Sequence, residues 1–159
     1  NELCLTRDVD TLIPIFAKKF GMSFPKDFSM LSYFVDHFER NTSIWSVIKK
    51  MHKTCGVGLL TNMYPRMFKA IQKRGLLPLI KWDVIIDSSV VCLQKPDRRI
   101  FTLAEERSRA KHDEILFVDN NLKNIVAARD FGWQTFFYDS ADHKNSSYYF
   151  LNYYEQNRD

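Results

Sequence analysis

Three short apolar runs in this sequence are each followed by side chains that can do chemistry. Thr61 and Asn62 follow the first run, and a threonine hydroxyl or an asparagine amide can donate a hydrogen bond to an anionic oxygen. Lys95 stands nine residues after the second run, before the next predicted helix, where its ammonium could hold a carboxylate and a phosphate together. Asp119 follows the third run, and carboxylate oxygens are ligands that Mg²⁺ favours.

Each of these signals also has an ordinary structural explanation. Thr61 and Asn62 would serve as a polar turn before a helix, and Lys95 as one of the many solvated surface lysines. Asp119, Asn120 and Asn121 offer an N-cap for the next helix, although different members of the trio can fill the structural and the chemical role together. The functional interpretation depends on the combination of all three signals at successive strand ends.

Hydrophobic periodicity predicts the elements that position these residues. Apolar residues recur at helical spacing through residues 9–20, 28–40 and 43–53, and short apolar runs then alternate with helical segments. The alternation predicts an α/β fold with a doubly wound, Rossmann-like parallel sheet, in which ligands bind at the carboxyl ends of the strands. The predicted strands are residues 57–60, 83–86, 115–118 and 134–138, and the helices among and after them are 65–74, 96–104, 121–131 and 146–156. We therefore divide the chain into a helical N-terminal segment, 1–54, and an α/β core, 55–159.

The three signals resemble motifs of the haloacid dehalogenase superfamily of hydrolases. Residues 58–62 (Gly-Leu-Leu-Thr-Asn) resemble the second motif of that family, residues 95–97 (Lys-Pro-Asp) the third, and residues 115–120 (Ile-Leu-Phe-Val-Asp-Asn) the fourth. The resemblance extends from about residue 56 to residue 139. It is closest to the subtype of bacterial haloacid dehalogenases and the phosphatase domain of soluble epoxide hydrolases. That subtype carries a helical cap between its first and second motifs, so residues 1–54 resemble this cap or its remainder.

The resemblance implies a phosphatase-like hydrolase that acts on a small phosphorylated metabolite through an aspartyl-phosphate intermediate. It gives phosphate binding to Thr61 with Asn62 as an auxiliary donor, and it gives Lys95 the task of steadying the nucleophile and the phosphate. Asp119 and Asn120 would hold Mg²⁺. Many members have a second acid at the position of Asn120, so we expect weaker Mg²⁺ binding here, with Asp87 as a conceivable helper.

The first motif of the family, Asp-x-Asp after an apolar strand, has one candidate in this chain. Asp8 and Asp10 have the spacing, but the stretch before them is short and the following glycine is absent. The favoured interpretation is that both are first-turn acids of a cap helix, where the helix dipole stabilises negative charge. The natural protein would then begin some tens of residues earlier. Without that first strand the sheet would have unpaired edges, which predicts self-association into a homo-oligomer.

Composition excludes several other classes of protein. The net charge of +4 comes from interspersed acids and bases, which argues against a nucleic-acid partner, and no apolar run reaches the ~20 residues of a membrane span. Three cysteines match neither a disulfide framework nor a zinc site and indicate a cytoplasmic protein. The four histidines are scattered without metal-ligand spacing. Two alternatives stay open: a catalytically silent member of the fold that binds a ligand or partner, and a binder of anionic polymers.

Overall fold

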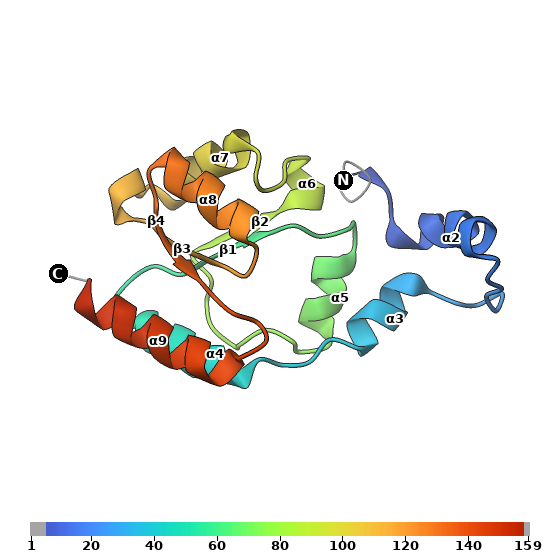
Figure 1. Ribbon diagram of the computed structural model, residues 1–159, viewed down its shortest axis with the longest axis horizontal. Coiled ribbons are helices and arrows are strands. Elements are labelled where there is room, and N and C mark those ends of the chain that lie inside the picture. The colour runs from blue at the N-terminus through green and yellow to red at the C-terminus, as the bar shows by residue number, and fades with distance from the viewer. Residues whose placement is uncertain (1–5, 158–159) are drawn as a thin grey trace. The chain divides into compact units, whose positions relative to one another are not determined.

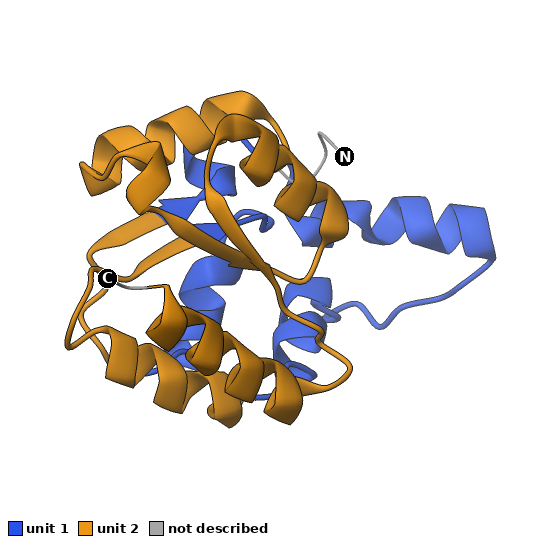
Figure 2. Ribbon diagram, turned by 60° about the vertical axis from the view of Figure 1, so that its left-hand side comes forward, with its two compact units in different colours: residues 1–40, 60–78, 86–94 blue, residues 41–59, 79–85, 95–159 orange. Residues whose placement is uncertain are grey.

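The structure is a computed structural model that describes residues 6–157. The apolar stretch of residues 3–5 before Asp8, and Cys4 within it, lie outside the described residues. The chain divides into two compact units, coloured separately in Figure 2. Unit 1 comprises residues 1–40, 60–78 and 86–94, and unit 2 comprises residues 41–59, 79–85 and 95–159. The division at residues 54 and 55 stays a prediction about which parts of the chain fold independently.

Unit 1 contains short helices, most of which pack around an apolar cluster. Its helices are η1 (Val9–Leu12, a 3-10 turn), α2 (Ile13–Phe20), α3 (Met30–Asp36), α5 (Met67–Lys73) and α6 (Ser88–Val91). The buried members of the cluster are Val9, Leu12, Met30, Leu31, Val35, Met67 and Ile71. Their spacing follows from helical periodicity, because residues three or four apart share one face of a helix.

The helix boundaries in unit 1 differ from the predicted ones for local reasons. The helix expected at residues 9–20 begins as the 3-10 turn η1, with the Asp8 side chain as its cap, and becomes α-helical from Ile13. The helix expected from Pro65 begins instead at Met67, because Arg66 has a φ of 69° and lies in the left-handed region. Such a φ is uncommon outside glycine and is incompatible with a right-handed helix.

Unit 2 contains a parallel strand pair and most of the longer helices. Its elements are α4 (Thr42–Met51), α7 (Arg98–Ser108), η2 (His112–Glu114), β3 (Leu116–Asp119), α8 (Leu122–Phe131), β4 (Gln134–Phe137) and α9 (His143–Gln156). β3 and β4 run parallel, with Leu116 opposite Gln134 and Asp119 opposite Phe137. The remaining two strands, β1 (Gly58–Thr61) and β2 (Val84–Asp87), are hydrogen-bonded to each other.

The two faces of the β3–β4 pair are covered by different helices, as Figure 1 shows. On one face, Leu116, Val118 and Phe136 pack against α4 and α9, which lie side by side. On the other face, Phe117 packs against Phe101 of α7 and against Trp133, which lies between α8 and β4. This division follows from the period of two along a strand, which sends successive side chains to opposite faces. The layering confirms the predicted α/β class.

The described helices carry no membrane span. Within residues 6–157, none of them is both long enough and apolar enough to cross a bilayer.

Candidate functional site

The centre of the candidate site in unit 2 is a buried ion pair between Lys95 and Asp119. Lys95 Nζ lies 2.7 Å from Asp119 Oδ2, and the two side chains are only 9% and 7% exposed. Asp119 is the last residue of β3, and Lys95 lies three residues before α7, which Asp97 caps. Charges this deeply buried persist in a fold only when they are paired and hydrogen-bonded.

Three groups hold the Asp119 carboxylate in place. Lys95 binds Oδ2, the backbone N–H of Asn121 donates to Oδ1 at 2.7 Å, and Asn124 Nδ2 donates to Oδ2 at 3.2 Å. Asn124 lies on the inner side of α8 and is 6% exposed. The carboxylate is therefore oriented by a lysine from the loop before α7 and by two donors from the start of α8.

Asp119, the last residue of β3, and the two asparagines that follow it have different roles. The Asn121 side chain caps α8 by accepting a hydrogen bond from the Lys123 N–H at 3.0 Å. Asn120 is exposed, and its amide Nδ2 donates to Ser140 Oγ at 3.4 Å. Asp119 makes the ion pair, so capping and the candidate chemistry fall to different residues of the trio.

The oxygen ligands at the end of β3 are of the type that a hard cation binds, but only two residues supply them. Asp119 offers a carboxylate and Asn120 an amide oxygen, and Mg²⁺ commonly binds one or two carboxylates while it keeps several waters. Within residues 6–157, no group of three or more His, Cys, Asp or Glu side chains is placed to hold a metal ion. Asp87, the conceivable helper, lies in unit 1, where it caps α6 through Ser89 N at 3.0 Å and Ser89 Oγ at 2.8 Å.

Unit 1 carries the predicted phosphate-binding pair at the end of β1. Thr61 is buried, and its hydroxyl donates to the Ile86 carbonyl of β2 at 3.2 Å. Asn62 follows and is exposed. Ser88, which is fully buried, accepts a hydrogen bond from Met63 N at 2.8 Å. These bonds fix the carboxyl ends of β1 and β2 against each other.

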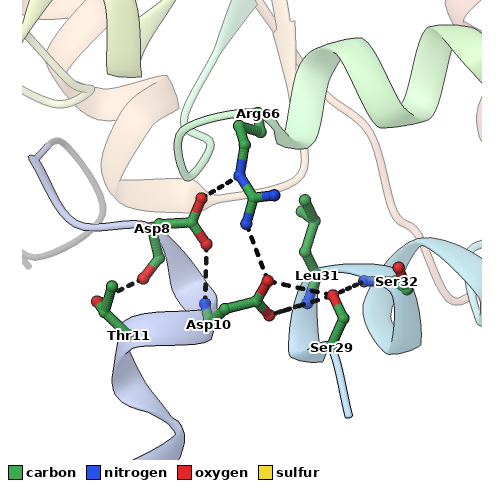
Figure 3. A network of polar contacts seen from close by, with 7 residues as sticks. All are labelled: Asp8, Asp10, Thr11, Ser29, Leu31, Ser32 and Arg66. Atoms are coloured by element: carbon green, nitrogen blue, oxygen red, sulfur yellow. Dashed lines mark hydrogen bonds and ion pairs between the residues drawn. The ribbon is translucent and has the colours of Figure 1, made fainter. Parts of the chain in front are cut away.

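Asp8 and Asp10 converge on one arginine of unit 1, as Figure 3 shows. Arg66 Nε binds Asp8 Oδ2, and Arg66 Nη2 lies 2.9 Å from Asp10 Oδ2. Asp8 Oδ1 also accepts from Asp10 N at 3.0 Å, and Asp10 Oδ1 accepts from the Leu31 N–H at 2.9 Å. Ser29 Oγ completes the cluster at 3.2 Å from Asp10 Oδ2.

This network keeps both acids ionised. The hydrogen bond from Arg66 is the largest influence on Asp8 and lowers the pKa of that carboxyl. Burial raises the pKa of Asp10, but the bonds from Leu31, Arg66 and Ser29 outweigh it, so that pKa is also lowered. The two carboxylates in turn raise the pKa of the Arg66 guanidinium. Asp8 thus caps η1 and Asp10 lies in its first turn, and both carboxylates bind Arg66.

The structure therefore gathers the predicted site residues into separate groups. Lys95 and Asp119 form an ion pair in unit 2, and Asn120 follows Asp119 in the chain. The other predicted site residues belong to unit 1: Thr61, Asn62, Asp8 and Asp10. Sequence reasoning missed Asn124 as a partner of Asp119 and Arg66 as a partner of the two acids. The sequence could have identified Asn124, because it is a polar residue on the apolar face of a predicted helix. Arg66 had none, because its two partners are 56 and 58 residues away.

Comparisons with known proteins agree with this architecture. The family model described as haloacid dehalogenase-like hydrolase matches residues 32–132. A predicted HAD-like family hydrolase from Porphyromonas gingivalis superimposes with a TM-score of 0.72 at 18% identity, over 92% of this chain and 74% of that one. No curated protein sequence matches the chain.

Two further solved structures share the fold. One is a HAD family enzyme from Bacteroides thetaiotaomicron, an aspartate-to-alanine mutant in complex with magnesium and inorganic phosphate. It superimposes with a TM-score of 0.68 at 17% identity, over 83% of this chain and 70% of that one. The other is an L-2-haloacid dehalogenase, with a TM-score of 0.63 at 15% identity, over 87% of this chain and 62% of that one.

Proposed function

This chain belongs to the haloacid dehalogenase-like hydrolases, whose family model matches well over half of it, and we propose that it hydrolyses the phosphate ester of a small metabolite. The observation that carries the proposal is the buried Lys95–Asp119 pair at the end of β3. A cation and a carboxylate with so little solvent are costly to keep for stability alone, and such groups gather at functional sites. One relative of the same fold was crystallised with magnesium and inorganic phosphate, which supports a phosphoryl substrate.

In this proposal the Lys95 ammonium offsets negative charge on the transferring phosphoryl group, as a preorganised cation does in a site poor in water. By the family resemblance, Thr61 and Asn62 would donate hydrogen bonds to phosphate oxygens. The Thr61 hydroxyl would first have to release the Ile86 carbonyl, to which it donates at 3.2 Å. Asp119 and Asn120 would hold Mg²⁺, which when bound would supply further positive charge beside the phosphate. Asn124 and the Asn121 N–H keep the Asp119 carboxylate in a fixed orientation for that purpose.

The nucleophile of this chain, by the family resemblance, would be Asp8, with Asp10 as its acid and base. A carboxylate oxygen of Asp8 would attack phosphorus while the bond to the ester oxygen breaks. The leaving alkoxide would take a proton from Asp10, which would first have to acquire one, because its contacts lower its pKa and keep it ionised. Water would then cleave the aspartyl phosphate and release inorganic phosphate. The lowered pKa of Asp8 keeps it anionic, as a nucleophile must be, but Arg66 occupies the same carboxylate. Arg66 would have to release Asp8 before the attack.

A second candidate function is that of a silent family member that binds a phosphorylated ligand without turnover. The engagement of both Asp8 and Asp10 by Arg66 favours it, because their oxygens already serve as structural acceptors. The single carboxylate at the end of β3 also favours it, since Asn120 adds no charge for a metal.

The decisive experiment is hydrolysis of a generic aryl phosphate with and without Mg²⁺. We expect turnover that requires Mg²⁺ and is lost in Asp8→Asn and Asp119→Asn. The matched control is Asp142→Asn, which removes the charge of an exposed residue that caps α9 and should leave turnover intact. Binding of inorganic phosphate without turnover would favour the silent member. Chloride release from a 2-chloro acid, with no phosphate released from the ester, would instead favour a dehalogenase.

A further inference from the structure

Phe117 and Asp119 lie on the same face of β3 because they are two residues apart in a strand. Lys95 Nζ contacts both of them: it lies 2.7 Å from Asp119 Oδ2 and 5.3 Å from the centroid of the Phe117 ring. The face of an aromatic ring carries negative potential and attracts a cation within about 6 Å. The ammonium therefore has two attractive partners that the same strand supplies.

The surroundings strengthen the contact between the ammonium and the ring. The Lys95 side chain is only 9% exposed, and a cation–π interaction gains energy when water is excluded from it. A lysine stem has four rotatable bonds, so the ammonium can take many positions unless its partners restrain it. A ring face beside the carboxylate narrows these positions further.

The Phe117 ring is itself held by its neighbours. Phe101 meets it edge-on, with ring centroids 6.0 Å apart and an interplanar angle of 79°, and the Trp133 ring centroid lies 5.7 Å away. Trp133 is fixed in turn, because its Nε1 donates to Glu105 Oε1 at 2.9 Å. Phe117 is 7% exposed, so its ring face is a rigid platform for the cation above it.

We propose that Phe117 is a positioning residue, which keeps the Lys95 ammonium over the Asp119 carboxylate through its ring face. Its contribution to catalysis rests on the proposed phosphatase function, but the contact between ring and ammonium does not. Leucine at position 117 would fill much of the same volume and remove the ring potential. Tyrosine would keep the ring potential.

A double-mutant cycle on folding stability tests the contact without any need for activity. The cycle combines Phe117→Leu with Lys95→Met, and Lys95→Gln replaces the latter if it fails to fold. We expect the two sites to be coupled by about 5- to 30-fold in the folding equilibrium constant, the range of a desolvated cation–π contact. Phe117→Tyr should keep most of the coupling. The control is Phe101→Leu, which truncates a neighbouring buried ring and leaves the Phe117 ring in place, and for which coupling should stay below about twofold.

A kinetic cycle then tests the role in catalysis. Phe117→Leu should lower kcat/KM about tenfold in the wild-type background and leave it unchanged in the Lys95→Met background, since there is no ammonium left to position. A merely structural effect would lower kcat/KM equally in both backgrounds, as expected for Phe101→Leu. Equal folding couplings for Phe117→Leu and Phe101→Leu would overturn the proposal. If Phe117 and Lys95 are strongly coupled in folding but the chain has no turnover, the proposed phosphatase function is wrong and the contact between ring and ammonium still holds.

Discussion

The Lys95 ammonium and the Asp119 carboxylate lie 2.7 Å apart, and neither side chain is more than 9% exposed. Each charge therefore depends on the other, since water cannot replace a lost partner at this depth. The pair between Lys50 and Glu155 makes the contrast, because those side chains are 59% and 40% exposed and water solvates both. Because the two buried charges depend on each other, the pair also contributes to the stability of unit 2.

Lys95→Met should therefore destabilise the fold strongly. It leaves the Asp119 carboxylate buried with hydrogen bonds but no countercharge, which costs about 3–5 kcal/mol in the free energy of unfolding. Urea unfolding measures this value at neutral pH. The control Lys50→Met removes an exposed cation and should cost less than about 1 kcal/mol. Equal costs for the two variants would mean that Asp119 is solvated in solution.

Asn124→Ala should weaken the site by removing the donor to Asp119 Oδ2. We expect a loss of about 1–3 kcal/mol in the free energy of unfolding, because a buried acceptor loses a partner. We also expect a fall of about tenfold or more in aryl phosphate hydrolysis, the scale on which supports of metal ligands act. Asn121→Ala is the control: it removes the cap of α8 but keeps the backbone N–H that binds Asp119. A cap costs about 1 kcal/mol, and activity should persist.

The strands, and the order in which the candidate site residues follow them along the chain, could be predicted because local sequence patterns determine both. Each strand was predicted from a short apolar run. The third strand was expected at residues 115–118 and is observed at Leu116–Asp119, and its pairing with β4 explains this shift of one residue. Asp119 pairs with Phe137, and the Tyr138 N–H donates to the Asp119 carbonyl at 3.0 Å. Asp119 is thus the last residue of the strand and not the first of the loop. The helix expected from residue 146 begins at His143, because Asp142 caps it by accepting from Asn145 N.

The contacts that orient the site could not be predicted, because they join residues far apart in the sequence. The ring of Phe117 lies beneath an ammonium that comes from 22 positions earlier, and Arg66 binds acids from another helix. Arg66 also has a left-handed backbone conformation, which its residue type does not predict. Periodicity identifies which residues share a face, but it does not identify which side chain of another element covers them.

Asn120→Asp should strengthen Mg²⁺ binding at the end of β3. It adds a second carboxylate beside Asp119, and the number of charged ligands sets the affinity of such sites, so we expect a gain of about tenfold or more. Isothermal titration with Mg²⁺ measures the affinity directly, whether or not the chain turns over substrate. Asp139→Asn, on an exposed turn, is the control for a change of surface charge. Unchanged affinity in Asn120→Asp would place the metal away from this position.

Arg66→Met should reduce the stability of unit 1 only above acidic pH. Hydrogen bonds from Arg66 and its neighbours lower the pKa of Asp8 and Asp10 in the folded state, below the unfolded value of about 3.9. The stabilisation is therefore fully present above that unfolded pKa, and it is lost as the pH falls through the lowered folded values, where both acids become protonated. Thermal unfolding of wild type and Arg66→Met between pH 7 and about pH 2 should show a difference in Tm that is constant near neutrality and shrinks in acid. Lys69→Met, on the exposed side of α5, controls for the loss of a cation. A difference that persists unchanged at the acidic limit would mean that Arg66 stabilises the fold through its aliphatic stem and not through the two carboxylates.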